Sequence, residues 1–315
     1  MFQGMEYIYE VYKENSFSKA AQKLFISQPS LSANVKRVEK KIGYPIFDRS
    51  TKPLKLTECG ERYIRAVESI MAIENEFSDY VNDLGDLKSG KLVIGGSSLF
   101  SSLVLPPLMG EFSEKFPFVE LDLVEESTAK LEEMLQNGTI DLFLDNCVLS
   151  DETFDAHFMT KEYLLLAVPK KLDVNQGLEK YQIHPEEIRK GTFLKNQIEP
   201  VPLEQFKNES FFVLKPENDT RIRAMEIFQK NHFMPKILFE LDQQMTSYNI
   251  TCSGMGISFI SSTLISRVPP HKEVVYYKLD EKSCSRNLYF YRKKGRYFSR
   301  AMEEFLKIAD TYGIQ

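Results

Sequence analysis

The sequence predicts a multidomain α/β protein, in which a small helical N-terminal unit and a long helix precede a body of alternating strands and helices. Two short amphipathic helix patterns stand back to back between Ser16 and Gly43. An apolar stripe with heptad spacing then runs from Thr57 to Gly85. After it, short apolar runs alternate with helix patterns, which is typical of a mostly parallel sheet covered on both faces. A chain of 315 residues is long enough for two or three such domains.

The composition is that of a folded protein whose positive charge is concentrated at the N-terminus. Hydrophobic residues make up 43% of the chain, and no run approaches the roughly 18 apolar residues of a membrane-spanning helix. Met1 is not followed by a secretory signal pattern, so we expect a cytoplasmic protein with no membrane partner. Residues 1–58 carry a net charge of +4 and residues 59–315 a net charge of −9. A basic head on an acidic body favours a DNA-binding unit joined to a body that does not bind DNA.

The cysteines and histidines do not predict a metal centre or a catalytic site. Cys59, Cys147, Cys252 and Cys284 are isolated from one another and from the histidines, which lie in separate segments. The sequence contains no nucleophile with a neighbouring base and no glycine-rich phosphate loop with its lysine. We therefore expect no metal, no cofactor and no enzymatic activity.

The region that ends at Gly43 has the pattern of a helix-turn-helix. In its first helix, Ala20 and Ala21 offer a small-residue face that lets another helix approach closely. The second helix has one apolar stripe, formed by Leu31, Val35, Val38 and Ile42. Ser27 is placed to cap this helix, Pro29 fits its first turn, and Gly43 is suited to end it.

The opposite face of the second helix has the chemistry of a DNA-reading surface. Its first turn is short and polar and its later turns are basic, which suits base contacts at one end and phosphate contacts along the rest. A solvated basic face is the alternative interpretation. The segment from Asp48 to Leu56 then predicts two short strands around a turn, the wing of a winged helix-turn-helix. The predicted DNA-binding residues are Ser27, Gln28, Pro29, Ser30, Ser32, Asn34, Lys36, Arg37, Arg49 and Lys52.

Four short motifs stand in order in this region. They are Ala20-Ala21-x-x-Leu24, Gln28-Pro29-Ser30-Leu31-Ser32, Phe47-Asp48-Arg49 and Leu56-Thr57-x-x-Gly60. Together they resemble the N-terminal signature of LysR-type transcriptional regulators, and the pattern is long and specific. The resemblance implies a winged helix-turn-helix domain over residues 1–58, a linker and dimerisation helix with a hinge over 59–88, and an effector-binding domain over 89–315. It also implies double-stranded DNA as a partner, and it places Lys52 at the wing tip, where a cation can enter the minor groove. A solvated hairpin lysine is the alternative.

The resemblance also implies that the body is a periplasmic-binding-protein-like domain of two α/β lobes with a small-molecule effector bound between them. The chain is expected to cross into the second lobe near Glu162 and to return near Arg267. This gives a first lobe of residues 89–161 and 268–315 and a second lobe of residues 162–267.

Ligands of such sheets bind beyond the carboxyl ends of the strands. The predicted effector-binding residues follow three expected strands of the first lobe and are Ser97, Ser98, Leu99, Phe100, Ser101, Ser127, Thr128 and Asp145. A serine or threonine at such a position is alternatively only a helix cap. A carboxylate at Asp145 disfavours an anionic effector unless a cation such as Lys161 neutralises it, and favours an amine, an amino acid or a neutral metabolite.

The long helix predicts a dimer. Its stripe consists of Tyr63, Ala66, Ile70, Ile73, Phe77, Tyr80 and Leu84, and an exposed seam of this length requires a partner helix. The resemblance implies the same dimer and tetramers built from it. A monomer with the helix folded on its own body is the alternative. We thus predict an effector-controlled DNA-binding regulator, with an effector-independent DNA binder that has a vestigial cleft, or a small-molecule binding protein or enzyme, as alternatives.

Overall fold

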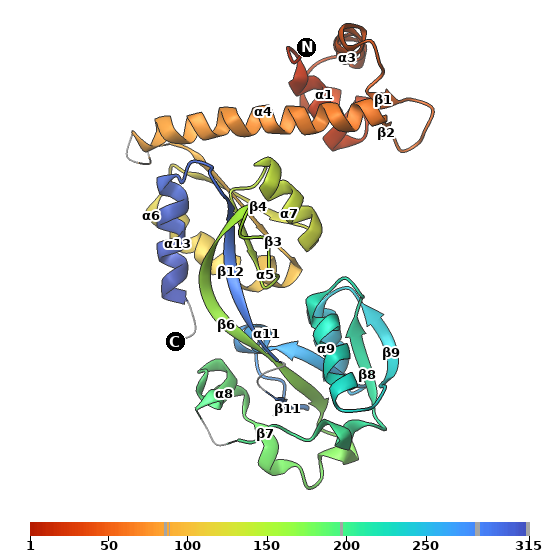
Figure 1. Ribbon diagram of the computed structural model, residues 1–315, viewed down its shortest axis with the longest axis vertical. Coiled ribbons are helices and arrows are strands. Elements are labelled where there is room, and N and C mark those ends of the chain that lie inside the picture. The colour runs from red at the N-terminus through yellow and green to blue at the C-terminus, as the bar shows by residue number, and fades with distance from the viewer. Residues whose placement is uncertain (85–86, 88, 196–197, 281–283, 313–315) are drawn as a thin grey trace. The chain divides into compact units, whose positions relative to one another are not determined.

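The computed structural model describes residues 1–84, 87, 89–195, 198–280 and 284–312 (Figure 1). The chain divides into two compact units. The first comprises residues 1–81 with 136–139, and the second comprises residues 82–135 with the chain from residue 140 onward. The predicted hinge residues Asp86 and Lys88 lie outside the described residues.

The first unit is built from helices and one hairpin. Its elements are α1 (Met5–Glu14), α2 (Phe17–Lys23), α3 (Gln28–Ile42), β1 (Phe47–Asp48), β2 (Lys55–Leu56) and α4 (Glu58–Asp83). Its core is a single hydrophobic cluster that takes residues from every helix, among them Ile8, Ala20, Val35 and Ile64. The first helix begins at Met5, directly after Gly4, which adopts a left-handed conformation with φ 89°.

The ends of α3 follow from local chemistry. Ser27 accepts a hydrogen bond on Oγ from the Ser30 backbone N–H at 3.3 Å, and Pro29 lies in the first turn. At the other end Gly43 adopts φ 88° and its N–H bonds to the Glu39 carbonyl oxygen. These boundaries agree with the prediction.

The predicted wing is a hairpin of two-residue strands. Phe47 pairs with Leu56 and Asp48 with Lys55 in antiparallel register. The Asp48 carboxylate accepts a hydrogen bond from the Ser50 backbone N–H at 2.9 Å, which shapes the beginning of the loop.

The second unit contains a ten-stranded sheet with the main order β4-β3-β5-β12-β6-β10-β8-β9. The first-lobe elements are β3 (Lys91–Gly96), α5 (Ser98–Leu103), α6 (Leu105–Lys115), β4 (Glu120–Glu125), α7 (Thr128–Asn137) and β5 (Leu142–Asp145). Strands β3, β4 and β5 are parallel, as the alternating pattern predicted.

The second lobe follows β6 (Phe154–Pro169), and its pattern is again strand and helix in alternation. Its elements are β7 (Gln182–Ile183), α8 (Pro185–Arg189), β8 (Ser210–Leu214), α9 (Asp219–Lys230), β9 (Lys236–Leu241), α10 (Gln244–Cys252), β10 (Ile257–Ser261), α11 (Ser262–Arg267) and β11 (Val274–Lys278). Short 3-10 turns lie at 173–175, 179–181, 192–194 and 203–206. The last two elements are β12 (Ser285–Lys293) and α13 (Arg300–Tyr312).

Two long antiparallel strands, β6 and β12, run side by side, and β12 pairs with residues 154–163 of β6 (Figure 1). Glu162, the predicted crossing point, lies within β6. The return does not lie near Arg267, because β11 pairs with the second-lobe half of β6, where Tyr276 is opposite Ala167. Residues 274–278 therefore belong with the second lobe, and the chain returns through β12.

Separate hydrophobic clusters stabilise the two lobes. Phe112, Leu144 and Phe305 lie in the main cluster of the first lobe, and Phe211 and Phe228 lie in one of the second. Another second-lobe cluster includes Ile260 and Leu264 of β10 and α11. Leu99 of α5 packs against this cluster and against the first-lobe cluster, so α5 touches both lobes.

Candidate functional site

The exposed first turn of α3 forms the first candidate site. Ser27, Gln28, Pro29 and Ser30 are all exposed. The Ser18 hydroxyl donates to Gln28 Oε1 at 3.5 Å, which brings α2 against this turn. The turn is thus a polar surface held by its own cap, and its contact with DNA stays a prediction.

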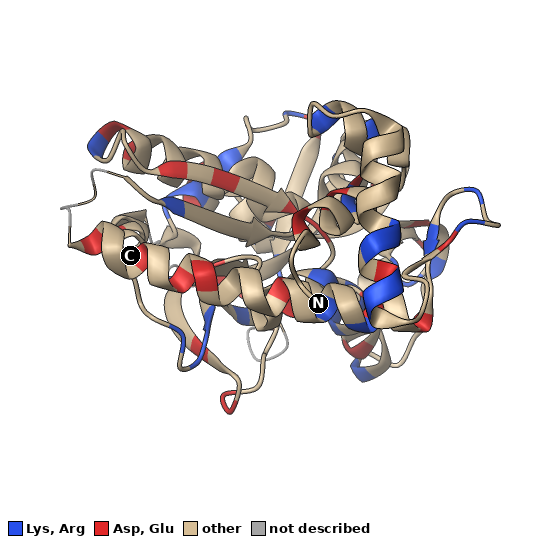
Figure 2. Ribbon diagram, turned by 90° about the horizontal axis from the view of Figure 1, so that it is seen from above, with Lys and Arg blue, Asp and Glu red and all other residues tan. Residues whose placement is uncertain are grey.

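The later turns of α3 are basic. Lys36 and Arg37 are exposed, whereas Ser32 and Asn34 are partly buried. The Arg37 guanidinium donates to Asn34 Oδ1 at 2.9 Å, so these two predicted contacts form a pair. In Figure 2 the blue Lys and Arg positions gather on helices near the N-terminus. The charge distribution suits a surface that approaches phosphates.

Arg49 has a structural partner that the sequence did not reveal. Its guanidinium pairs with Glu39 Oε2 at 3.0 Å and lies 5.1 Å from the centre of the Phe17 ring. The other Glu39 oxygen accepts a hydrogen bond from the Ile46 backbone N–H at 2.9 Å. Glu39 therefore connects the beginning of the wing to α3, and the Arg49 ion pair is part of this connection. Lys52, in the exposed loop between the wing strands, is free of such an anchor among the described residues.

The apolar stripe of α4 has two parts. Tyr63 is buried in the core of the first unit, where it stacks on Phe2 with ring centres 5.3 Å apart. Ala66 and Ile70 are partly buried. The remaining stripe residues are exposed and are Ile73 at 68%, Phe77 at 69%, Tyr80 at 48% and Leu84 at 72%. An apolar surface of this kind marks an interaction site, and its use in a dimer stays a prediction.

The predicted effector residues of α5 differ in their exposure. Phe100 is part of the first-lobe core, and Ser101 is buried with its hydroxyl donating to the Gly96 carbonyl oxygen at 2.8 Å. These two side chains therefore stabilise the turn after β3. Ser97, Ser98 and Leu99 are partly exposed.

Asp145 is buried and its hydrogen bonds are satisfied. Oδ1 accepts hydrogen bonds from the backbone N–H groups of Asn146 at 2.8 Å and Cys147 at 2.9 Å. Oδ2 accepts one from the Thr128 hydroxyl at 3.1 Å, so this predicted pair does come together, whereas Ser127 is exposed. Burial raises the pKa of Asp145, and these hydrogen bonds oppose the rise. Lys161 is not its counterion, because the Lys161 ammonium lies over the Tyr163 ring, 5.4 Å from its centre.

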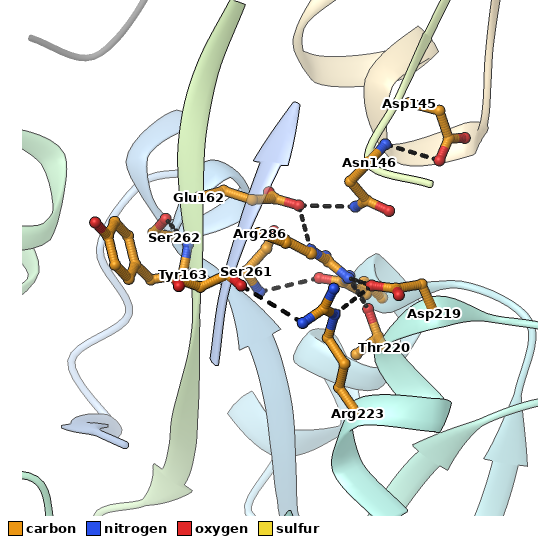
Figure 3. A network of polar contacts seen from close by, with 12 residues as sticks. Asp145, Asn146, Glu162, Tyr163, Asp219, Thr220, Arg223, Ser261, Ser262 and Arg286 are labelled. Carbon is orange, nitrogen blue, oxygen red and sulfur yellow. Dashed lines mark hydrogen bonds and ion pairs between the residues drawn. The ribbon is translucent and has the colours of Figure 1, made fainter. Parts of the chain in front are cut away.

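A buried ion pair joins the two long strands close to Asp145 (Figure 3). Glu162 and Arg286 are opposite each other in the β6–β12 register, and Arg286 Nε donates to Glu162 Oε1 at 2.6 Å. The Asn146 side-chain amide donates to the same oxygen at 2.8 Å. Arg286 Nη1 donates to Asp219 Oδ2 at 2.6 Å and to Thr220 Oγ1 at 3.1 Å, at the beginning of α9. The network therefore links a first-lobe loop to a second-lobe helix through both crossing strands.

Further hydrogen bonds connect α9, α10 and α11 near the Glu162–Arg286 pair. The Gln244 side-chain amide donates to Thr220 Oγ1 at 2.9 Å and accepts from the Ser261 backbone N–H at 3.0 Å. The Ser262 hydroxyl accepts from the backbone N–H of Tyr163 at 3.0 Å (Figure 3). The beginnings of α9, α10 and α11 thus meet around the Glu162–Arg286 pair.

Three buried polar atoms of this region have no hydrogen-bond partner among the described residues. They are Glu162 Oε2, Arg286 Nη2 and Thr263 Oγ1. Buried polar atoms of folded proteins are nearly always paired, so each exception requires an explanation. From the sequence, Glu162 was expected only as a crossing point, and Arg286 and Thr263 were not among the predicted site residues. The sequence offered one signal, a charged residue close to an apolar run: Glu162 directly precedes residues 163–168, and Arg286 lies two residues before residues 288–291.

A separate hollow lies in the second lobe beside α10. It has a volume of about 590 Å³ and is bordered by Met245, Tyr248, Cys252 and His271, among others. None of the predicted effector residues lines it.

Across the part of the chain that the structure describes, no helix is both long and apolar enough to cross a membrane.

A winged helix-turn-helix unit followed by a two-lobed α/β body defines a class of regulators that carry a DNA-binding head and a ligand-binding body. Residues 2–61 match the family model of the bacterial regulatory helix-turn-helix proteins of the lysR family. Residues 85–312 match the LysR substrate binding domain. This protein therefore belongs to the LysR family of transcriptional regulators.

Similar proteins and solved structures cover most or nearly all of the chain. The uncharacterized HTH-type transcriptional regulator YcgK of Bacillus subtilis is 29% identical over 97% of this chain and 92% of its own. Full-length CbnR in complex with its target DNA has a TM-score of 0.66 at 16% identity, covering 99% of each chain. The regulatory domain of CcmR from Synechocystis in complex with 2-PG has a TM-score of 0.58 at 17% identity, covering 71% of this chain and 97% of that domain. At these identities the solved structures establish the fold alone.

Proposed function

We propose that this LysR-family protein binds double-stranded DNA through α3 and the wing, and that a small molecule bound between the lobes of the second unit changes that binding. The observation that carries the DNA proposal is the capped, exposed first turn of α3, with Gln28 at its surface, on a unit of positive net charge. The CbnR complex with target DNA supports the same use of the fold in a relative.

The ligand proposal is supported by the polar residues gathered where the lobes join. Leu99 packs against clusters of both lobes, and the Glu162–Arg286 pair connects them. A ligand there would bind one arrangement of the lobes better than another, which is the requirement for control. In CcmR a domain of this fold holds 2-PG.

The exposed half of α4 supports a dimer. Ile73, Phe77 and Leu84 are each about two-thirds exposed or more, and a second copy of the same helix offers the matching seam. Two DNA-binding units in one dimer would read two half-sites related by a two-fold axis.

DNA footprinting with the full-length protein tests the DNA proposal. The DNA is the region upstream of the protein's own gene and of the neighbouring gene, at two salt concentrations. We expect a long protected site that weakens steeply with salt and is lost or shortened in Gln28→Ala and Lys52→Ala. Gln205→Ala and Lys272→Ala change the same residue types at exposed positions of the second unit and should leave protection intact. Equal protection by all four variants would contradict the assigned interface.

A further inference from the structure

The unpaired buried atoms at the junction of the lobes indicate what kind of ligand the body binds, an inference that rests on the proposed function. We propose that the ligand is a small α-amino acid. Its ammonium group donates to Glu162 Oε2, and its carboxylate accepts from Arg286 Nη2 and Thr263 Oγ1.

Glu162 supplies an acceptor that no described residue uses. The residue is 0% exposed. Its Oε1 already accepts from Arg286 and Asn146, whereas Oε2 has no partner among the described residues. A buried carboxylate oxygen without a donor is costly. It favours a ligand that brings a positively charged donor and disfavours one that brings a second carboxylate.

Arg286 and Thr263 supply the matching donors. A guanidinium has five N–H donors and no acceptor, and Arg286 uses Nε and Nη1 while Nη2 is unpaired among the described residues. Both side chains are nearly inaccessible, with Arg286 at 4% and Thr263 at 1% exposed. A ligand carboxylate satisfies such donors with charge-assisted hydrogen bonds.

Arg267 reinforces the carboxylate end of the site. It lies one turn after Thr263 on α11 and therefore on the same helix face. Its guanidinium donates to the Thr263 carbonyl oxygen at 3.5 Å and to Ser266 Oγ at 3.2 Å. Burial lowers the pKa of Arg267, and the negative charge of Glu162 opposes this change.

The charges of the site decide between ligand classes. A dicarboxylate would bring one of its charges against Glu162, with the buried Asp145 nearby. A simple amine would leave Arg286 Nη2 and Thr263 Oγ1 unpaired. An α-amino acid satisfies both ends and adds no net charge. Glu162, and not Asp145 as first predicted, is therefore the carboxylate that disfavours an anionic ligand, because both Asp145 oxygens already accept hydrogen bonds.

Titration calorimetry on the full-length protein tests this assignment. The probes are the twenty common L-amino acids, each beside its decarboxylated amine and its deaminated acid, together with a set of dicarboxylates. We expect at least one amino acid to bind, and its amine and its deaminated acid to bind at least about tenfold more weakly, since each loses one charged contact.

Two variants locate the binding in the structure. Thr263→Val keeps the side-chain volume and removes a hydroxyl that has no partner among the described residues, so the protein should fold and bind the amino acid about tenfold more weakly. Glu162→Gln should weaken amino-acid binding roughly ten- to a hundredfold and improve relative binding of the deaminated acid. Glu186→Gln changes a half-exposed surface carboxylate of α8 and should leave affinity unchanged.

The outcomes separate the ligand assignment from the proposed function. Absence of amino-acid binding up to about 10 mM, preference for a dicarboxylate, or unchanged affinity in a folded Thr263→Val would overturn the assignment. The footprint of the same preparations is an independent readout. If the protein protects DNA but binds no amino acid, the DNA-binding proposal stands and the amino-acid assignment is rejected. If it binds an amino acid but protects no DNA, the amino-acid assignment stands and the DNA-binding proposal is rejected.

Discussion

At the scale of single residues, the close approach of α4 to the chain before the wing depends on Gly60. A Cβ on Gly60 would overlap the Ile46 carbonyl oxygen, a backbone atom that cannot turn away. We expect Gly60→Ala to destabilise the first unit by a few kcal/mol, in the manner of an overpacked core, and to abolish DNA protection. Thermal melts and footprints of the full chain measure both effects.

Gly110 provides the matched control. It lies in α6, and a Cβ there would meet nothing within 4 Å. Gly110→Ala should therefore be neutral or stabilising by up to about 1 kcal/mol, because alanine favours the helix. If the two variants melt alike, the packing argument for Gly60 is wrong.

The buried ion pair with Glu162 makes the second unit sensitive to substitution of Arg286. Arg286→Met would leave Glu162 fully buried without its cation, and loss of one partner of a buried pair typically costs about 3–5 kcal/mol. Arg189→Met breaks an exposed pair with Glu186 and should cost less than about 1 kcal/mol. Urea unfolding of the second unit, followed by circular dichroism, compares them. A similar cost for both would mean that the Glu162–Arg286 pair is not an important stabilising contact.

Asp145 gives a prediction about pH. Burial raises its pKa in the folded protein, so its contribution to stability is present below the ordinary aspartate pKa of about 4 and is lost as pH rises through the raised value. Asp145→Asn removes this ionisation. The variant should gain stability relative to the wild type between about pH 4 and neutral pH. Melting temperatures across this range measure the difference, and a constant difference would contradict the prediction.

At the scale of elements, the exposed part of the α4 stripe is predicted to hold the dimer. Phe77→Lys places a charge in the seam, and we expect it to shift the protein from dimer to monomer in sedimentation experiments and to weaken DNA protection. Met234→Lys adds the same charge at a comparably exposed apolar residue of the second lobe, 74% against 69% exposed, and should remain dimeric. A monomeric wild type would reject the dimer altogether.

Elements that depend on local chemistry were predicted well from the sequence. Ser27 and Gly43 mark the ends of α3 because capping and a positive φ are properties of single residues. The strand–helix order of the body likewise followed from local periodicity. The placement of β11 was wrong, because its pairing with β6 joins residues about one hundred positions apart, such as Tyr276 and Ala167. Local patterns do not contain that information.

The candidate site was predictable only in part for the same reason. The Thr128–Asp145 contact joins two expected strand ends. The opposition of Glu162 and Arg286 instead depends on the register of two distant strands. Phe100 and Ser101 were expected at the ligand and are buried in the lobe, because the turn after β3 directs them inward. The sequence does not show which polar side chains already form hydrogen bonds within the protein, and only the fold does.

At the scale of the whole molecule, the polar network is the physical link between the lobes. Asn146 belongs to the first lobe, Asp219 belongs to the second, and the Glu162–Arg286 pair joins them. A ligand that completes the unpaired atoms of this pair favours one arrangement of the lobes. Couplings between distant sites are typically about 1–3 kcal/mol, which corresponds to a change in affinity of roughly 5- to 150-fold.

The measurement that tests the central claim most directly is the affinity of the full-length protein for its protected DNA site, with and without a saturating amino acid that it binds. Fluorescence anisotropy at fixed salt gives both values, and Glu162→Gln serves as the variant with impaired ligand binding. The proposed control predicts a change of at least about fivefold in the wild type and a smaller one in Glu162→Gln at the same ligand concentration. Equal DNA affinity with and without bound ligand would contradict it.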